Sequence, residues 1–78
     1  MNKEELLWRL GQRIKKLRED KGITQQQIAH ELDTEKSNIS RLESGRVNPK
    51  FSTLINVAKQ LGIKITELVD IDNTETNE

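Results

Sequence analysis

Residues 24–45 read TQQQIAHELDTEKSNISRLESG, and this stretch carries the signals of two short helices joined by a tight turn. Thr24 stands three residues before Gln27, which is the spacing of a capping box that satisfies the free N–H groups of a helix start. The first helix continues to about Leu32, and Gly45 ends the second one. The stretch therefore predicts a pair of short helices packed across a turn.

The second helix of this pair has two faces of different chemistry. Ile39 and Leu42 lie three residues apart and are predicted to face the core. The opposite face is rich in hydrogen-bond donors, and its only carboxylate, Glu35, stands at its start. Ammonium and guanidinium groups can bond guanine O6 and N7 in the major groove of DNA, and hydroxyls can bond donors or acceptors there. The residues predicted to read base edges are Lys36, Ser37, Ser40 and Arg41, with Asn38 at the edge of the face.

The flanking sequence predicts more helices. Before the pair, an apolar stripe at helical spacing predicts a helix over about residues 4–20 that Gly22 ends. The stripe consists of Leu7, Leu10, Ile14 and Leu17. After the pair, Pro49 disfavours helix at the residue before it, so a loop is expected there. A fourth helix follows, and the residues predicted to face the core from it are Phe51, Leu54, Val57 or Ala58, and Leu61.

The end of the chain is predicted to contain little regular structure. Gly62 stops the fourth helix, and residues 65–69 can form one or two further turns. Residues 70–78 are acidic and rich in Thr and Asn, so we expect a frayed tail. The whole pattern predicts an all-α fold, a compact domain of four to five helices over residues 1–69.

Charge is balanced in total but not along the chain. The 78 residues, enough for one domain with a small core, hold 13 Lys and Arg and 13 Asp and Glu. Residues 1–50 carry 11 basic and 8 acidic side chains, whereas residues 51–78 carry 2 and 5. Because local fields govern docking to phosphates, the basic first part is compatible with a nucleic-acid partner despite the zero net charge.

The composition disfavours other classes of function. The chain has no cysteine, and His30 alone cannot build a metal site, so we predict neither metal nor cofactor. It shows no paired nucleophile and base and no phosphate-cradling glycine loop, so we predict no enzyme. With 3% aromatic residues it lacks a stacking platform for single-stranded RNA. A polar N-terminus and the lack of a long apolar stretch predict a cytoplasmic, nucleoid-associated protein without membrane contact.

Motifs spread along most of the chain resemble one known family. Over roughly residues 9–69 the sequence resembles Cro and phage-repressor type helix-turn-helix regulators, also called the xenobiotic-response-element family. The resemblance implies a lambda-repressor-like fold, with helices 2 and 3 as the helix-turn-helix, and transcriptional regulation through binding to double-stranded DNA. The segments that match include GQRI at 11–14, GITQ at 22–25, ISRLESG at 39–45 and NP at 48–49.

The resemblance also implies roles for individual residues. The recognition helix covers about residues 36–43, and Gln25 occupies a phosphate-contacting position at the start of helix 2. Arg18 and Glu43 match an ion pair that is partly buried in relatives and has a structural role. Lys36 suits a phosphate contact as well as a base contact. Further phosphate contacts are implied for Ser44, Arg46 and Lys50.

Four positions depart from the family pattern. Asp33 stands in the turn where Gly is usual, and Asp tolerates the left-handed backbone region better than most residues. Glu35 stands where Ser or Thr is common and would repel a nearby phosphate, so either Thr34 caps the helix instead or Glu35 turns away from DNA. Lys50 and Lys64 stand where the family often has a small N-cap residue, before the fourth helix and before the turns at residues 65–69.

A domain of this size reads few base pairs alone, so we predict a homodimer on a palindromic operator. Trp8, with its neighbours Leu6 and Leu7, either packs over the acidic back of the same domain or forms a dimer surface with the region after helix 4. That region includes Ile63, Ile65, Leu68 and Val69. The acidic residues near the turn are Glu31, Asp33 and Glu35. They could touch RNA polymerase, although a solvated helix end explains them more simply. As an alternative function, the acidic tail over residues 70–78 could hold a partner protein such as a toxin.

Overall fold

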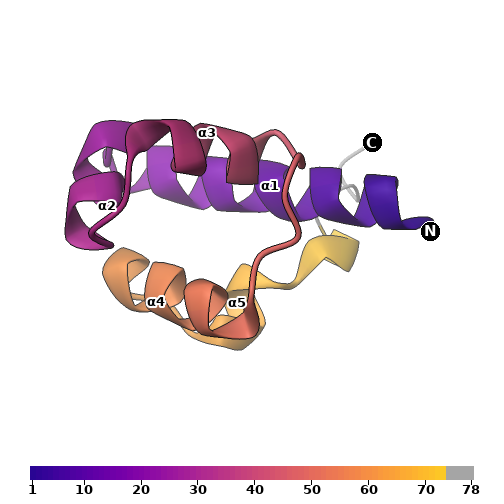
Figure 1. Cartoon of the computed structure of the whole chain (residues 1–78). Coiled ribbons are helices and arrows are strands. Elements are labelled where there is room, and N and C mark those ends of the chain that lie inside the picture. Colours follow the sequence, from indigo (N-terminus) through magenta and orange to yellow (C-terminus); the bar gives the residue numbers. More distant parts are fainter. Residues whose placement is uncertain (74–78) are drawn as a thin grey trace.

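The computed structural model describes residues 1–73, which form five α-helices and a final 3₁₀ turn (Figure 1). No strand occurs within this part of the chain, so the predicted all-α fold is confirmed. None of its helices is long and apolar enough to span a membrane. The elements are α1 (Lys3–Asp20), α2 (Gln25–Glu31), α3 (Lys36–Glu43), α4 (Phe51–Leu61), α5 (Ile65–Leu68) and η1 (Ile71–Asn73).

Local signals in the sequence explain where α1 and α2 begin and end. The Asn2 side chain accepts a hydrogen bond from the Glu5 backbone N–H at 2.8 Å and caps α1, whose C-terminal end is followed by Gly22 with a φ of 71°. The predicted capping box of α2 is present, because the Thr24 hydroxyl accepts from the Gln27 N–H at 3.0 Å while the Gln27 side chain accepts from the Thr24 N–H at 2.8 Å.

In the turn between α2 and α3, one residue has a strained backbone conformation. Asp33 has a φ of 56°, the left-handed conformation that the departure from Gly at this position led us to expect. Glu35 is the N-cap of α3, yet no side chain caps that helix. The expectation that Thr34 caps α3 is therefore wrong, since its hydroxyl accepts a hydrogen bond from the Asn38 side chain instead.

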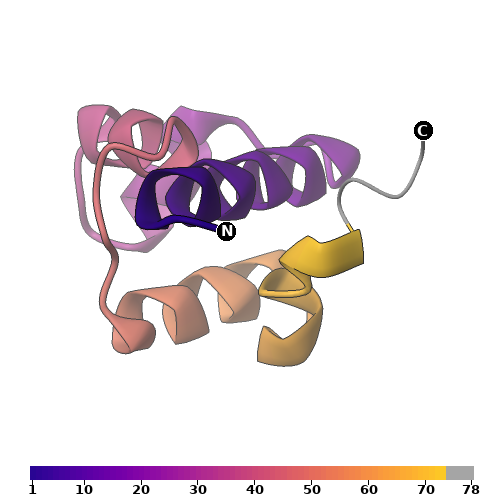
Figure 2. The same ribbon diagram turned by 90° about the vertical axis from the view of Figure 1, so that its right-hand side faces the viewer.

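The helices pack as two layers around one core. α1 and α3 lie side by side, α2 connects them at one end, and α4 runs beneath them in both views (Figures 1 and 2). α5 and η1 lie beneath α1 on the same side as α4, and both contact α1 (Figures 1 and 2). Burial of these apolar side chains is the main force that holds the layers together. The core consists of Leu10, Ile14, Leu17, Ile28, Ala29, Ile39, Leu42, Leu54, Val57, Ala58, Leu61 and Leu68.

Two expectations about the C-terminal half need correction. Phe51 was expected to face the core, but it is 65% exposed at the first position of α4. Helical spacing places it on the apolar stripe, yet spacing alone cannot tell whether a neighbouring element covers that end. The domain boundary at residue 69 is also too early, because Ile71 in η1 packs against the core. The rest of the expected tail, residues 74–78, lies outside the described residues.

Candidate nucleic-acid interface

α3 presents a polar face to solvent and an apolar face to the core. Ile39 and Leu42 are buried, as predicted from their spacing. Because the donors occupy the opposite side of the same helix, they form one continuous row on the surface of the domain. The exposed residues of this row are Lys36, Ser37, Asn38, Ser40 and Arg41, the five that the sequence placed on the base-reading face.

A buried ion pair fixes α3 to α1. The Arg18 guanidinium binds the Glu43 carboxylate through two hydrogen bonds, Nε to Oε2 at 2.6 Å and Nη2 to Oε1 at 3.1 Å. Arg18 also donates from Nη1 to the carbonyl oxygen of Ile23 at 2.7 Å. Both side chains are more than nine-tenths buried, and the bonded carboxylate raises the pKa of Arg18 above its ordinary value. The pairing implied by the resemblance is present, and it is more deeply buried than the resemblance implied.

Gln25 extends this ion pair toward the surface. Its side-chain amide donates from Nε2 to Glu43 Oε1 at 2.9 Å, so the amide is already bonded inside the protein. The sequence predicted this side chain as a phosphate contact, and no sequence signal indicated its bond to Glu43. An amide nitrogen carries two protons, so one N–H of Gln25 remains for a phosphate, as does its backbone N–H at the first position of α2.

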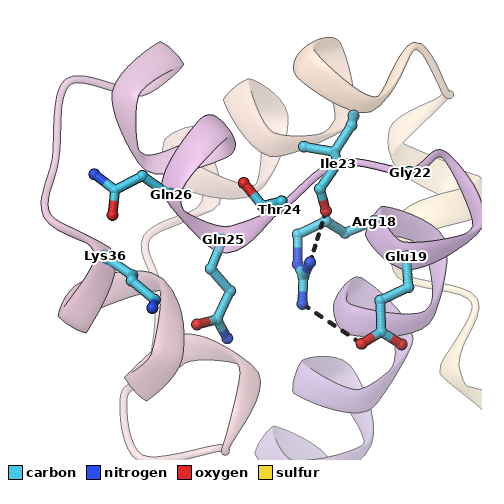
Figure 3. A pocket seen from close by; sticks show the side chains of 8 residues that line it. All are labelled: Arg18, Glu19, Gly22, Ile23, Thr24, Gln25, Gln26 and Lys36. Carbon is cyan, nitrogen blue, oxygen red and sulfur yellow. Dashed lines mark hydrogen bonds and ion pairs between the residues drawn. The ribbon is translucent and has the colours of Figure 1, made fainter.

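A shallow hollow of about 410 Å³ opens beside Gln25. Figure 3 shows Gln25 between Lys36, from the start of α3, and Arg18, from the end of α1. Lys36 is exposed and lines this opening together with the amide side chains of Gln25 and Gln26 and the carboxylate of Glu19. The hollow therefore carries charges of both signs, with the cation of Lys36 on the side of α3.

A second hollow, of about 540 Å³, lies on the other side of α3. Arg41 from α3 and Lys50 from the loop before α4 both line it, so the structure brings a predicted base contact close to a predicted phosphate contact. Ser44 and Arg46 are exposed in the same loop region, where the Ser44 hydroxyl donates to the Arg41 carbonyl oxygen at 3.2 Å. The predicted phosphate contacts therefore border the recognition face on both sides.

The Trp8 backbone lies close to the end of the recognition helix. A Cβ added to Gly45 would lie 2.9 Å from the Trp8 backbone, so Trp8 lies beside the loop after α3. Trp8 is 55% exposed, and whether its side chain belongs to a dimer surface stays a prediction. Leu6 is also exposed but lies nearly opposite Trp8 on α1, since two residues span about 200° of helix.

The structure has two short helices, α2 and α3, joined by a tight turn. The second of them packs against the core and exposes a face rich in hydrogen-bond donors. This arrangement defines a helix-turn-helix domain. The helix-turn-helix domain family matches residues 11–71 of the chain. An immunity repressor protein of Bacillus phage phi105 is 40% identical over 60 residues, which are 77% of this chain and 42% of that protein. An uncharacterised helix-turn-helix type transcriptional regulator of Sinorhizobium fredii is 37% identical over 60 residues, 77% of this chain and 78% of that protein.

A solved structure agrees with these relatives. The restriction-modification controller protein C.AhdI from Aeromonas hydrophila superposes with a TM-score of 0.76 and 31% identity, covering 80% of this chain and 94% of that one. The chain therefore belongs to the helix-turn-helix family of transcriptional regulators, as its motifs indicated. The matched segment spans less than half of the phage immunity repressor, so the likeness to that protein concerns this domain alone.

Proposed function

We propose that the chain regulates transcription by binding double-stranded DNA in a sequence-specific manner, with α3 in the major groove. The observation that carries this proposal is the row of exposed donors on α3, a helix held in place by the buried Arg18–Glu43 pair. Base edges in the major groove offer acceptors to such a row, and a rigid helix can present it in one fixed register.

Each predicted site residue receives a role on this interface. The base-reading group is the row on α3 defined above, in which Arg41 is the strongest candidate for a guanine. The phosphate-contacting group lies around it, at the start of α2 and in the loop after α3. This second group consists of Gln25, Ser44, Arg46 and Lys50.

We infer that the active form is a homodimer on a palindromic operator. α3 has eight residues and is about 12 Å long, so one copy reads only a few base pairs. Two copies related by a two-fold axis, with half-sites one helical turn apart, double the sequence that is read. Contacts to RNA polymerase through Glu31, Asp33 and Glu35, all three exposed, or to a toxin stay predictions.

Selection of bound fragments from a random duplex library at physiological salt tests the proposal. We expect enrichment of a palindrome whose half-sites are about 10 base pairs apart, centre to centre. Folded protein that enriches no sequence would contradict sequence-specific binding. Enrichment of a single half-site, with a monomer in sedimentation experiments on the complex, would contradict the dimer but keep the reading helix.

Replacement of Arg41 with Ala is expected to weaken specific binding by about 1–3 kcal/mol and to relax the preference at one operator position. The reason is the loss of two parallel N–H donors that only guanine matches well. Arg41 is exposed and outside the core, so the fold should remain intact. Repeating the library selection with this variant measures the effect, and an unchanged base preference would exclude Arg41 as a reader.

Replacement of Lys50 with Ala is expected to weaken binding to all sequences by a similar factor. Lys50 is the exposed N-cap of α4 and makes no side-chain cap bond, so its removal should leave the helix in place. Each lost phosphate contact lowers the slope of log affinity against log salt by about 1. Titrations between about 50 and 200 mM salt measure that slope. A loss confined to one operator sequence would instead assign Lys50 to base reading.

A further inference from the structure

We propose that Asn38 and Thr34 act together as a positioning relay that orients Arg41 and thereby sets its base preference. Arg41 donates from Nη2 to Asn38 Oδ1 at 2.6 Å, and Asn38 donates from Nδ2 to Thr34 Oγ1 at 2.8 Å. The three residues are spaced by four and three positions, so they follow one strip of the helix surface from the turn into α3. This inference rests on the proposed binding to DNA and changes the role assigned to Asn38.

The direction of both hydrogen bonds is fixed by chemistry. A guanidinium can only donate, so the side-chain atom of Asn38 that faces Arg41 must be the oxygen. The amide nitrogen then has to face Thr34, whose hydroxyl must accept. The amide of Asn38 is therefore locked in one orientation by Arg41 at one end and by the turn at the other.

This arrangement leaves Arg41 able to read a base. Nη2 carries two protons, one on each of the two donor edges of the guanidinium, and Asn38 Oδ1 accepts one of them. Whichever edge Asn38 uses, the other edge keeps a complete pair of parallel N–H donors. That pair matches O6 and N7 of guanine. Holding the long side chain in place before binding also reduces the rotamer entropy that is lost on contact.

The same arrangement commits one proton and one lone pair of the Asn38 amide to the protein, so only its second proton and its second lone pair remain for a base. Asparagine recognises adenine by using its oxygen and its nitrogen at once. Both atoms of Asn38 already have protein partners in the relay. Thr34 belongs to the turn and precedes α3, so its influence on base choice is indirect. Asp33, the residue before Thr34, has the left-handed backbone conformation, and the chain turns there so that Thr34 lies next to Asn38.

A double-mutant cycle tests the relay. The variants are Asn38→Ala, Arg41→Ala and the double variant, each examined by library selection and by binding to duplexes altered at the position that Arg41→Ala relaxes. Loss of one ordering hydrogen bond should reduce guanine preference at that position about three- to tenfold in Asn38→Ala. Once Arg41 is removed, Asn38→Ala should have no further effect on base preference. Thr34→Val should reproduce part of the loss, and Thr34→Ser should restore it, because serine keeps the accepting hydroxyl.

The control is Gln60→Ala, which removes an exposed amide from α4 and should leave base preference unchanged. The relay is overturned if Asn38→Ala alters a position that Arg41→Ala leaves alone, since Asn38 would then read a base itself. It is also overturned if Asn38→Ala leaves the preference as in the wild type.

Side-chain NMR of the free protein separates this proposal from the proposed function. The order parameter of the Arg41 Nε–H should fall in Asn38→Ala and in Thr34→Val, and it should be unchanged in Gln60→Ala. If the wild type selects no DNA sequence, the proposed function fails, and the role of the relay in base choice fails with it. The NMR result then still shows whether Asn38 holds Arg41. An unchanged order parameter would overturn the positioning contact even if a DNA sequence is selected.

Discussion

Replacement of Glu43 with Ala is expected to lower the free energy of unfolding by about 3–5 kcal/mol. The variant removes both short bonds from the buried Arg18 guanidinium to a buried carboxylate, and it leaves Arg18 the Ile23 carbonyl oxygen and the more exposed Glu19 carboxylate at 3.8 Å. Arginine cannot lose its charge to relieve the cost. Gln25 loses its partner as well, because its amide donates to the same carboxylate. Small domains have a stability of only about 5 kcal/mol, so the variant should keep about 0–2 kcal/mol and unfold at a much lower urea concentration than the wild type. Urea denaturation followed by far-ultraviolet circular dichroism measures the loss.

Two further variants isolate the cause of this loss. Asp20→Ala removes a carboxylate whose bond to Lys16 is exposed, and it should change stability by no more than about 0.5 kcal/mol. The double variant Arg18→Met, Glu43→Leu replaces both buried charges with apolar groups and should recover most of the loss. If Glu43→Ala costs no more than Asp20→Ala, the buried pair does not hold α3 in place. If the double variant is as unstable as Glu43→Ala, the loss comes from packing and not from the loss of the buried charge partner of Arg18.

Features that depend on a few neighbouring residues could be predicted from the sequence. The capping box at Thr24 and Gln27 needs only two side chains at a fixed spacing, and the structure confirms it. Asp33 could be placed in the left-handed region because the resembled family usually has Gly at this turn position and Asp tolerates that conformation. The exposed row on α3 follows from helical periodicity once Ile39 and Leu42 are assigned to the core.

Features that depend on distant contacts could not be predicted in the same way. The bond from Gln25 to Glu43 joins residues 18 positions apart, and nothing at either position indicates it. The exposure of Phe51 and the packing of Ile71 depend on which elements reach the ends of α4 and α1. Even the pairing of Arg18 with Glu43 was implied by resemblance to a family and did not follow from the residues themselves. Tertiary packing therefore decides the details that the roles of the site residues depend on.

Replacement of Gly11 with Ala is expected to destabilise the domain by about 3 kcal/mol, although Ala is the better helix former by about 1 kcal/mol. Gly11 is buried inside α1 where it crosses α3. A Cβ at this position would overlap the carbonyl oxygen of Glu43 and would lie 2.7 Å from that of Leu42. Both are backbone atoms, so no rotamer change can make room and α3 must move away from α1. Thermal denaturation should show the loss, and the folded fraction should bind the selected operator more weakly.

Gly22→Ala provides the matched control, because it tests backbone strain without a clash. Nothing lies within 4 Å of a Cβ added there, but the residue has a φ of 71°. An L-residue in that conformation costs about 1–2 kcal/mol, so stability should fall while the folded protein keeps its affinity for the operator. Gly11→Ala should instead lower both quantities, since it displaces the helix that carries Arg41. Unchanged stability in Gly11→Ala would show that α1 and α3 can separate at little cost, and the close contact would then not set the position of α3.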